Sequence, residues 1–265
     1  MGKLIDLDDE QIVNRIDCNA TTAEKIRQLQ KLSRENEPVV KKFLEEIDRK
    51  YSTESKVSHK EPDKIAEKAN RPAIKDLKKW HDVEHIRDSF RFKTVLNDIE
   101  DLPKIAEDLR ETGIEVIKTD TDKVLSPGFW GWRIAALDLK MPNGQLVEYY
   151  LPVKEVEEAK KAGNHQLFEK WRNVDIEKLT AEQENQYLND TDESKEKYDS
   201  AWQKYLERTK QKPDRIKEVL EKTEKVFEKP KAKNVDKLPQ EKKTSKLIQR
   251  LKEQKTRSKE DDLTR

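Results

Sequence analysis

The sequence predicts an α/β or α+β domain built on a mixed sheet of about four to five strands, with helices flanking the sheet. Three observations predict this class. Large aromatic residues concentrate between about residues 56 and 175, although the chain of 265 residues is 42% charged and 33% hydrophobic. Strand-like and helix-like apolar patterns alternate within that stretch. Pro142-Asn143-Gly144 separates two strand-like runs and is typical of a hairpin turn.

The high charge content indicates how the chain is divided. A globular domain normally carries about 25% charged residues, so solvated segments should surround a smaller folded unit. We expect a helical segment over 1–55, one folded domain over 56–175, a charged helical extension over 176–230 and a disordered basic tail over 231–265.

Helical periodicity dominates the first part of the chain. Thr21 or Thr22 can cap a helix, and its apolar pattern continues after a break that we expect near Pro38. The stretch 62–80 predicts a helix that stops around Arg71-Pro72, because the residue before a proline disfavours the helical region. A second short helical piece should follow.

The pattern changes after residue 85. We expect strands within 86–96, 114–120 and 133–153, the last being the hairpin, and helices over 99–113 and 154–172. Gly113 is a natural C-terminal glycine for the first of these helices, and Gly163 interrupts the second.

Composition excludes several classes of protein. Cys18 is the only cysteine, so an intrachain disulfide and a multi-cysteine metal site are impossible. No secretory signal and no apolar run of membrane-spanning length is visible, so we expect a soluble, cytoplasmic chain without a membrane partner. Residues 201–265 carry 21 Lys and Arg against 12 Asp and Glu. This tail either contacts nucleic acid or, as we favour, is a solvated extension.

Three lysines form a stripe ahead of the first predicted strand. Lys60, Lys64 and Lys68 are spaced by four residues, so they share one helical face. Like charges on one face repel by a few tenths of a kcal/mol per pair. This lysine face could bind phosphates. A solvated lysine stripe is the simpler interpretation of the spacing alone.

Charges of both signs lie on stretches that should form strands. Asp82 and Arg87 open the first predicted strand, and Glu148 shares a strand face with Leu146 and Tyr150. A carboxylate among apolar neighbours is costly unless it is paired or bound to a metal. Asp82 and Glu148, on neighbouring strands, could therefore hold one Mg²⁺ together with phosphates and water. Two unrelated surface acids are the alternative.

An aromatic loop precedes the predicted hairpin. Residues 126–136, SPGFWGWRIAA, hold two glycines and three large aromatic side chains. Glycine lets a backbone approach a ligand closely, and an aromatic ring offers a stacking surface for a base. Alternatively, Phe129 and Trp130 pack into the domain core. Trp132 is then the better candidate for contact with a ligand.

These features, in this order, resemble the synthetase domain of RelA/SpoT-like nucleotidyltransferases. The resemblance covers about residues 56–175 and is strongest toward the RelA/SpoT-like domains of phage head-associated and toxin-like polyproteins. The matching positions are Lys60, Pro62, Ile65 and Lys68 in the helix, Asp82 and Arg87 at the strand, Pro127, Gly131, Trp132 and Arg133 in the loop, Glu148 in the V-E strand, and His165 and Arg172 in the following helix.

The resemblance implies a nucleotidyltransferase-like fold and an ATP diphosphokinase activity. The β,γ-diphosphate of ATP would pass to a ribose 3′-hydroxyl, as in guanosine tetraphosphate metabolism or at a tRNA end. The implied roles are Lys60 and Lys68 on ATP phosphates, Arg87 on adenine, Asp82 and Glu148 as catalytic Mg²⁺ ligands, Trp132 under the acceptor base, Arg133 on a phosphate, and His165 at the substrate. Self-association and a phage-encoded or host-delivered setting also fit the resemblance.

Three departures from the family pattern leave the acceptor open. Ser58 stands in place of an arginine, Ala136 in place of a histidine and Tyr150 in place of a glutamine. The last two help family members handle a guanine nucleotide, so an AMP-type nucleotide or a tRNA end is an alternative acceptor. A catalytically degenerate nucleotide-binding or structural module of a phage or mobile-element protein is a second interpretation. A charged helical adaptor that binds nucleic acid through its tail is a third.

Overall fold

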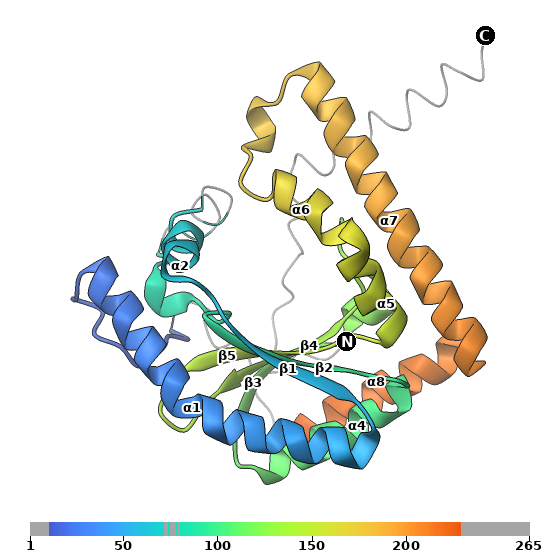
Figure 1. Ribbon diagram of the computed structural model, residues 1–265, viewed down its shortest axis with the longest axis horizontal. Coiled ribbons are helices and arrows are strands. Elements are labelled where there is room, and N and C mark those ends of the chain that lie inside the picture. The colour runs from blue at the N-terminus through green and yellow to red at the C-terminus, as the bar shows by residue number, and fades with distance from the viewer. Residues whose placement is uncertain (1–10, 72–73, 75–77, 79, 229–265) are drawn as a thin grey trace, which may run out of the picture.

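A five-stranded mixed sheet forms the centre of the protein (Figure 1). The computed structural model describes residues 11–71, 74, 78 and 80–228. The strands are β1 Glu54–His59, β2 Phe90–Val95, β3 Glu115–Asp120, β4 Ala135–Lys140 and β5 Leu146–Leu151, in the order β1-β2-β5-β4-β3. β2 and β5 are parallel, and the other neighbours are antiparallel. The predicted fold class is confirmed.

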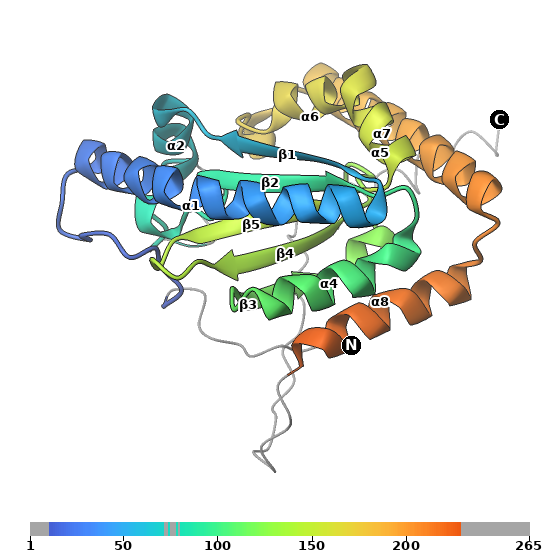
Figure 2. The same cartoon turned by 60° about the horizontal axis from the view of Figure 1, so that its bottom comes forward.

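Helices cover both sides of this sheet. They are α1 Thr22–Tyr51, α2 Pro62–Ala69, α4 Leu102–Glu111, α5 Lys154–Ala159, α6 His165–Trp171, α7 Ala181–Thr209 and α8 Pro213–Phe227. Short 3-10 turns are η1 Val83–His85, η2 Ile99–Asp101, η3 Asp122–Val124 and η5 Ile176–Lys178, and η4 Lys160–Asn164 is a π-helical turn. Figures 1 and 2 show α1, α4 and α8 on one side of the sheet and α6 and α7 on the other. None of these helices is long and apolar enough to cross a bilayer.

The first helix departs from the sequence prediction. α1 begins at a Thr21 capping box and runs through Pro38 to Tyr51, so the break expected near Pro38 is wrong. Proline costs an internal helix hydrogen bond. However, Phe43 and Ile47, beyond the proline, are buried against the sheet, and this packing offsets the loss. The second helical piece expected after Pro72 lies largely outside the described residues.

One strand was not predicted at all. β1, with the sequence ESKVSH, contains a single apolar residue, Val57, and forms the edge of the sheet. All six of its positions pair with β2. A polar edge strand gives no alternating apolar signal, because neither of its faces has to be fully buried.

The hydrophobic core does not end at residue 175. Tyr198, Trp202 and Tyr205 of α7 belong to the main core, and Tyr205 is fully buried. α8 packs against α4 through residues that include Ile216. The helices expected to form a charged extension therefore share one core with the sheet. The tail expected over 231–265 lies outside the described residues.

The two faces of the sheet differ in chemistry. Phe92 and Tyr149 lie on the core face, where the Tyr149 ring meets the edge of Phe43 on α1. On the opposite face, cross-strand pairing aligns two polar rows. One row is Ser58, Arg91, Glu148, Asp138 and Lys118, and the other is Lys56, Lys93, Tyr150, Ala136 and Asp120. This polar face carries the candidate site.

Candidate active site

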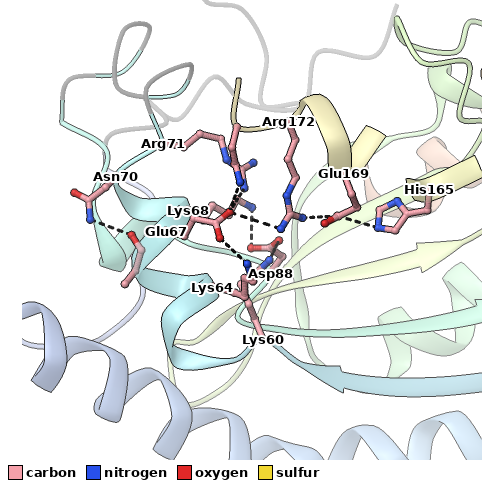
Figure 3. A network of polar contacts seen from close by, with 12 residues as sticks. Lys60, Lys64, Glu67, Lys68, Asn70, Arg71, Asp88, His165, Glu169 and Arg172 are labelled. Atoms are coloured by element: carbon pink, nitrogen blue, oxygen red, sulfur yellow. Dashed lines mark hydrogen bonds and ion pairs between the residues drawn. The ribbon is translucent and has the colours of Figure 1, made fainter. Parts of the chain in front are cut away.

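Two lysines converge on the carboxylate of Asp88. Lys60 Nζ lies 2.9 Å from Oδ2, and Lys68 Nζ lies 2.7 Å from Oδ1 (Figure 3). Lys60 begins the link between β1 and α2, where its backbone N–H donates to the carbonyl of Ser89. Lys68 lies near the end of α2. Burial would raise the pKa of Asp88, but the charges of Lys68 and Lys60 outweigh it and hold that pKa well below its usual range.

Glu148 is the second acid of the site. It lies in the middle of β5, and the Tyr150 hydroxyl donates a hydrogen bond to its carboxylate. Burial and then the negative charge of Asp88 raise the pKa of Glu148, whereas Lys68 and Tyr150 act in the opposite direction. The two acids therefore lie close enough to repel each other, which favours a cation between them.

Asp82 does not take part in this pair, contrary to the prediction from the sequence. Its carboxylate is 2.8 Å from Lys25 Nζ of α1, and its backbone begins η1. It lines neither of the cavities described below. β2 begins at Phe90, so the acid at the entrance of the strand is Asp88. The prediction placed the strand entrance several residues too early.

A cavity of about 370 Å³ opens beside Asp88, between α2, the aromatic loop, α6 and α7. Such a volume suits a small ligand. The basic residues that line it are Lys60, Lys68, Arg71, Arg91, Lys123, Lys160 and Arg172, against the acids Asp88 and Glu169. This excess of positive charge favours an anionic ligand.

The aromatic loop packs and lines the cavity at the same time. Phe129 stacks on Tyr187 with ring centroids 5.6 Å apart, in a small apolar cluster that also contains Trp130 and Trp171. Phe129 and Trp130 nevertheless face the cavity as well. Both interpretations of these rings therefore apply.

Trp132 stands between two cavities. The second, of about 240 Å³, lies over the polar face of the sheet and contains Glu148 and Ala136. Trp132 lines both cavities, and its ring meets Tyr150 edge-on at 5.6 Å. Lys160 Nζ lies 4.4 Å from the centroid of the ring. A base that stacks on Trp132 therefore shares the ring with this ammonium group.

Arg87 lies in the second cavity, where it forms an ion pair with Asp138 of β4. Both side chains are largely buried, with exposed fractions of 17% and 16%. The structure thus brings Arg87 near Glu148, while Lys60 and Lys68 line the larger cavity. An adenine contact by Arg87 stays a prediction.

Arg133 lines none of the cavities described here, so the phosphate contact predicted for it stays a prediction without support from this geometry. Its Nη1 donates to the carbonyls of Val124 and Leu125, and its Nη2 lies 2.8 Å from Asp199 of α7. The guanidinium also covers the Trp202 ring. Arg133 therefore joins the aromatic loop to α7, because it leaves the chain on the side opposite its neighbour Trp132.

An ion-pair network connects α2 with the C-terminal end of α6 (Figure 3). Glu67 of α2 accepts a 2.7 Å hydrogen bond from Asn173 and lies 3.6 Å from Arg172. Lys64 of the same helix and Arg71, just beyond its C-terminal end, contact the same carboxylate. Hydrogen bonds from Lys64 and Asn173 lower the pKa of Glu67 to about 2.

His165 begins α6 and lines the cavity, as the resemblance implied. Its Nε2 lies 3.1 Å from Glu169, which also pairs with Arg172. Burial, and then the charge of Lys160, lower the pKa of His165. Both effects favour the neutral form of His165.

Sequence reasoning missed Asp88, Arg91 and Lys160. A weak signal existed for the first two, because Asp88-Ser-Phe-Arg91 places an acid and a base three residues apart at the start of an alternating strand. No sequence signal marked Lys160, which reaches the cavity through the π-helical turn η4.

The described residues contain no cluster of three or more metal-binding side chains. However, Asp88 lines the cationic cavity, and Glu148 lines the cavity that adjoins it. Mg²⁺ is typically bound by one or two carboxylates plus substrate phosphates and water, so this donor set fits Mg²⁺.

Comparisons with solved structures show the fold. Small alarmone synthetase 2 from Bacillus subtilis aligns with a TM-score of 0.51 and 18% identity, covering 69% of this chain and 97% of that one. Small alarmone synthetase 1 from Bacillus subtilis bound to its product pppGpp gives 0.48 and 14% over 69% and 92%. A GTP pyrophosphokinase family protein from Streptococcus pneumoniae gives 0.47 and 15% over 74% and 93%. No family model and no curated protein matches the sequence.

Proposed function

We propose that this protein transfers the β,γ-diphosphate of ATP to a ribose 3′-hydroxyl on an acceptor nucleotide or RNA end. One observation carries the proposal: Asp88 lies in a cavity lined by seven cationic side chains, and Glu148 lines an adjoining cavity that shares Trp132 and Tyr150 with it. The fold shared with small alarmone synthetase 2 supports it. Diphosphate transfer depends mainly on positioning and charge neutralisation, which such a site can supply.

Asp88 and Glu148 would hold Mg²⁺ in this proposal. Bound Mg²⁺ supplies neutralisation of the charge on the transferred diphosphate. The mutual repulsion of the two acids, evident in the raised pKa of Glu148, is relieved when a cation lies between them.

Lys60 and Lys68 would change partners when ATP binds. Both neutralise Asp88 in the ligand-free protein. Lysine ammonium groups have three donors each, so they can hold Asp88 and phosphate oxygens together. The β- and γ-phosphates would then lie at the α2 side of the cavity.

Glu148 would orient the acceptor hydroxyl and accept its proton. The 3′-oxygen attacks the β-phosphorus, the bond from that phosphorus to the oxygen bridging to the α-phosphate breaks, and AMP leaves with the bridging oxygen. A raised pKa makes Glu148 a better base than an ordinary carboxylate. The hydrogen bond from Tyr150 fixes its carboxylate.

The acceptor would enter through the second cavity, beside Trp132 and the Arg87–Asp138 ion pair. Ala136 leaves that wall without the histidine expected for a guanine nucleotide. An acceptor other than GDP or GTP therefore belongs to the proposal, as does a phage-encoded or toxin-type setting in a cytoplasm.

The test is a transfer assay with ATP labelled on its terminal phosphate, Mg²⁺ and a panel of GDP, GTP, AMP, ADP, ATP and bulk tRNA. The expected result is AMP formation with label on one acceptor, lost in Glu148→Gln. ATP binding without AMP formation across the panel would instead identify a degenerate nucleotide-binding module. Absence of ATP binding would overturn both readings of the site.

A further inference from the structure

A third cavity joins the main one on the polar face of the sheet. It measures about 150 Å³ and lies at the β1 edge, where Lys56, Ser58 and Lys93 form its outer wall. Arg91, Tyr150 and Lys160 line both this cavity and the main cavity. These three side chains form the junction between the two spaces.

Lys160 lies at this junction as a half-buried cation. No described carboxylate forms an ion pair with it. The two acids that act on it from a distance are engaged elsewhere, Glu157 with Lys93 and Glu169 with His165 and Arg172. Its Nζ lies against the ring of Trp132 instead. A partly buried ammonium group that has other cations nearby and no ion-pair partner is stabilised by an anion bound beside it.

Arg91 completes the junction. It is the register partner of Glu148 in the parallel β2–β5 pair, so it lies beside the proposed base. Its Nε donates to Ser58 Oγ at 3.1 Å, and the described residues provide no hydrogen-bond acceptor for its Nη groups. Those groups are available to an anion at the junction.

We propose that Arg91 and Lys160 bind the α-phosphate of the donor nucleotide, on which negative charge develops as AMP leaves. This rests on the proposed function. Lys60 and Lys68 gather at Asp88 and suit the β- and γ-phosphates. Arg91 is the register partner of Glu148, and Lys160 lines the junction together with Tyr150, whose hydroxyl donates to Glu148. The bond to the leaving oxygen would break on this side of the site. Lys160 then acts on the leaving group, while the proton of the acceptor passes to Glu148.

The protonation of Lys160 would control this contact. Burial, together with the charges of Arg91 and Lys93, lowers the pKa of Lys160 to about 8, although Glu157 opposes the shift. The charged and titratable groups that face it are Lys56 on β1, Arg91 and Lys93 on β2, Tyr150 on β5, Glu157 on α5, His165 and Glu169 on α6, and Tyr198 on α7. In the free protein Lys160 is charged below about pH 8 and neutral above it, so anion binding weakens as pH rises through that value.

Calorimetric titration with α,β-methylene-ATP and Mg²⁺ between pH 7 and pH 9.5 tests the binding part. The wild-type affinity should fall by about tenfold per pH unit above pH 8. Lys160→Arg should keep the affinity and remove the fall, because arginine stays charged. Lys160→Met should bind weakly at every pH. Lys161→Met, an exposed neighbour, serves as the control and should behave as wild type.

Kinetics separates a leaving-group role from simple binding. Lys160→Met should lower kcat by about 100-fold, the size typical of a lost charge-stabilising donor, and raise the KM for ATP much less. A flat wild-type binding profile to pH 9.5, or unchanged binding and kcat in Lys160→Met, would overturn the inference. A pH-dependent affinity without transfer to any acceptor would instead refute the proposed reaction and leave the anion site standing.

Discussion

Arg91 on β2 and Glu148 on β5 are register partners, so the two residues occupy neighbouring positions on the polar face of the sheet. Each is held by another group: Arg91 by the Ser58 hydroxyl and Glu148 by the Tyr150 hydroxyl. The parallel pairing of two strands far apart in sequence therefore places a cationic residue, Arg91, and an acidic residue, Glu148, on one rigid surface. Such a scaffold suits chemistry that depends on fixed positions.

Changing Asp88 to asparagine should lower the transfer activity far more than changing Asp82 to asparagine. Asp88→Asn removes the acid shared by Lys60 and Lys68, so we expect transfer to fall by about 100-fold or more. Asp82→Asn changes a partly exposed acid that pairs with Lys25 and should keep most of the activity. Initial rates of AMP formation measure both. Equal losses in the two variants would mean that the site is placed incorrectly.

Replacing Glu148 with glutamine should stabilise the ligand-free protein increasingly as pH rises. The folded pKa of Glu148 is raised by burial and by Asp88, so folding favours its neutral form. This contribution is complete below the unfolded pKa of about 4.3 and is lost as pH rises through the raised folded value. Melting temperatures of both proteins should therefore diverge between pH 4 and pH 8, with Glu148→Gln higher. A constant difference across this range would argue against the raised pKa.

The ion-pair network that connects α2 with α6 should depend on Glu67. Because the folded pKa of Glu67 is lowered to about 2, its carboxylate contributes to folding stability above the unfolded pKa, and this contribution is lost as pH falls toward about 2. The side chain is 30% exposed, so the stability effect of Glu67→Gln should stay below about 1 kcal/mol. Hydrogen exchange in α2 and α6 should nevertheless accelerate. Glu61→Gln, at an exposed helix cap without a side-chain hydrogen bond, is the control. Identical exchange in both variants would show that Glu67 does not hold the helices together.

Trp132→Ala should mainly weaken binding of the acceptor. One stacked base contributes about 1–3 kcal/mol, which corresponds to a rise of about 5-fold to 150-fold in the acceptor KM. The KM for ATP should change less, because Lys60 and Lys68 are untouched. Steady-state kinetics with the acceptor found in the transfer assay measures both constants. A variant that saturates with acceptor as easily as wild type would remove Trp132 from the acceptor site.

The sequence predicted the sheet well where alternation was strong. β2, β4 and β5 each bury one face completely. Their sequences therefore carry apolar residues at every second position, which predicts a strand. β1 is polar on its exposed side, so its strand character comes from pairing with β2 rather than from its own pattern. Pro38 likewise signals a break locally, while the packing of Phe43 and Ile47 keeps α1 continuous.

Lys68 and Glu148 of the candidate site could be proposed from the sequence because they lie on a regular helix and a regular strand. The second acid of the site was misplaced because Asp82 and Asp88 both precede the strand, and only the true start of β2 at Phe90 decides between them. Lys160 gave no signal because it is one of several charged residues at the end of α5, and only the structure shows that it lines the cavity. The chain kinks directly after it, at Ala162 and Gly163.

Gly131 should be required for the aromatic loop to pack under α7. Its φ is +79°, and a Cβ there would lie 2.8 Å from the Lys195 Cα. Backbone of a long helix cannot give way cheaply, so Gly131→Ala combines a left-handed strain of about 1 kcal/mol with a clash. We expect a loss of about 2–4 kcal/mol, measured by urea unfolding. Gly128→Ala is the matched control, because a Cβ at Gly128 meets nothing within 4 Å. If both variants unfolded at the wild-type urea concentration, α7 would not press on the loop as closely as the structure has it, and the wall that Ser194 and Tyr198 give the cavity would be less fixed.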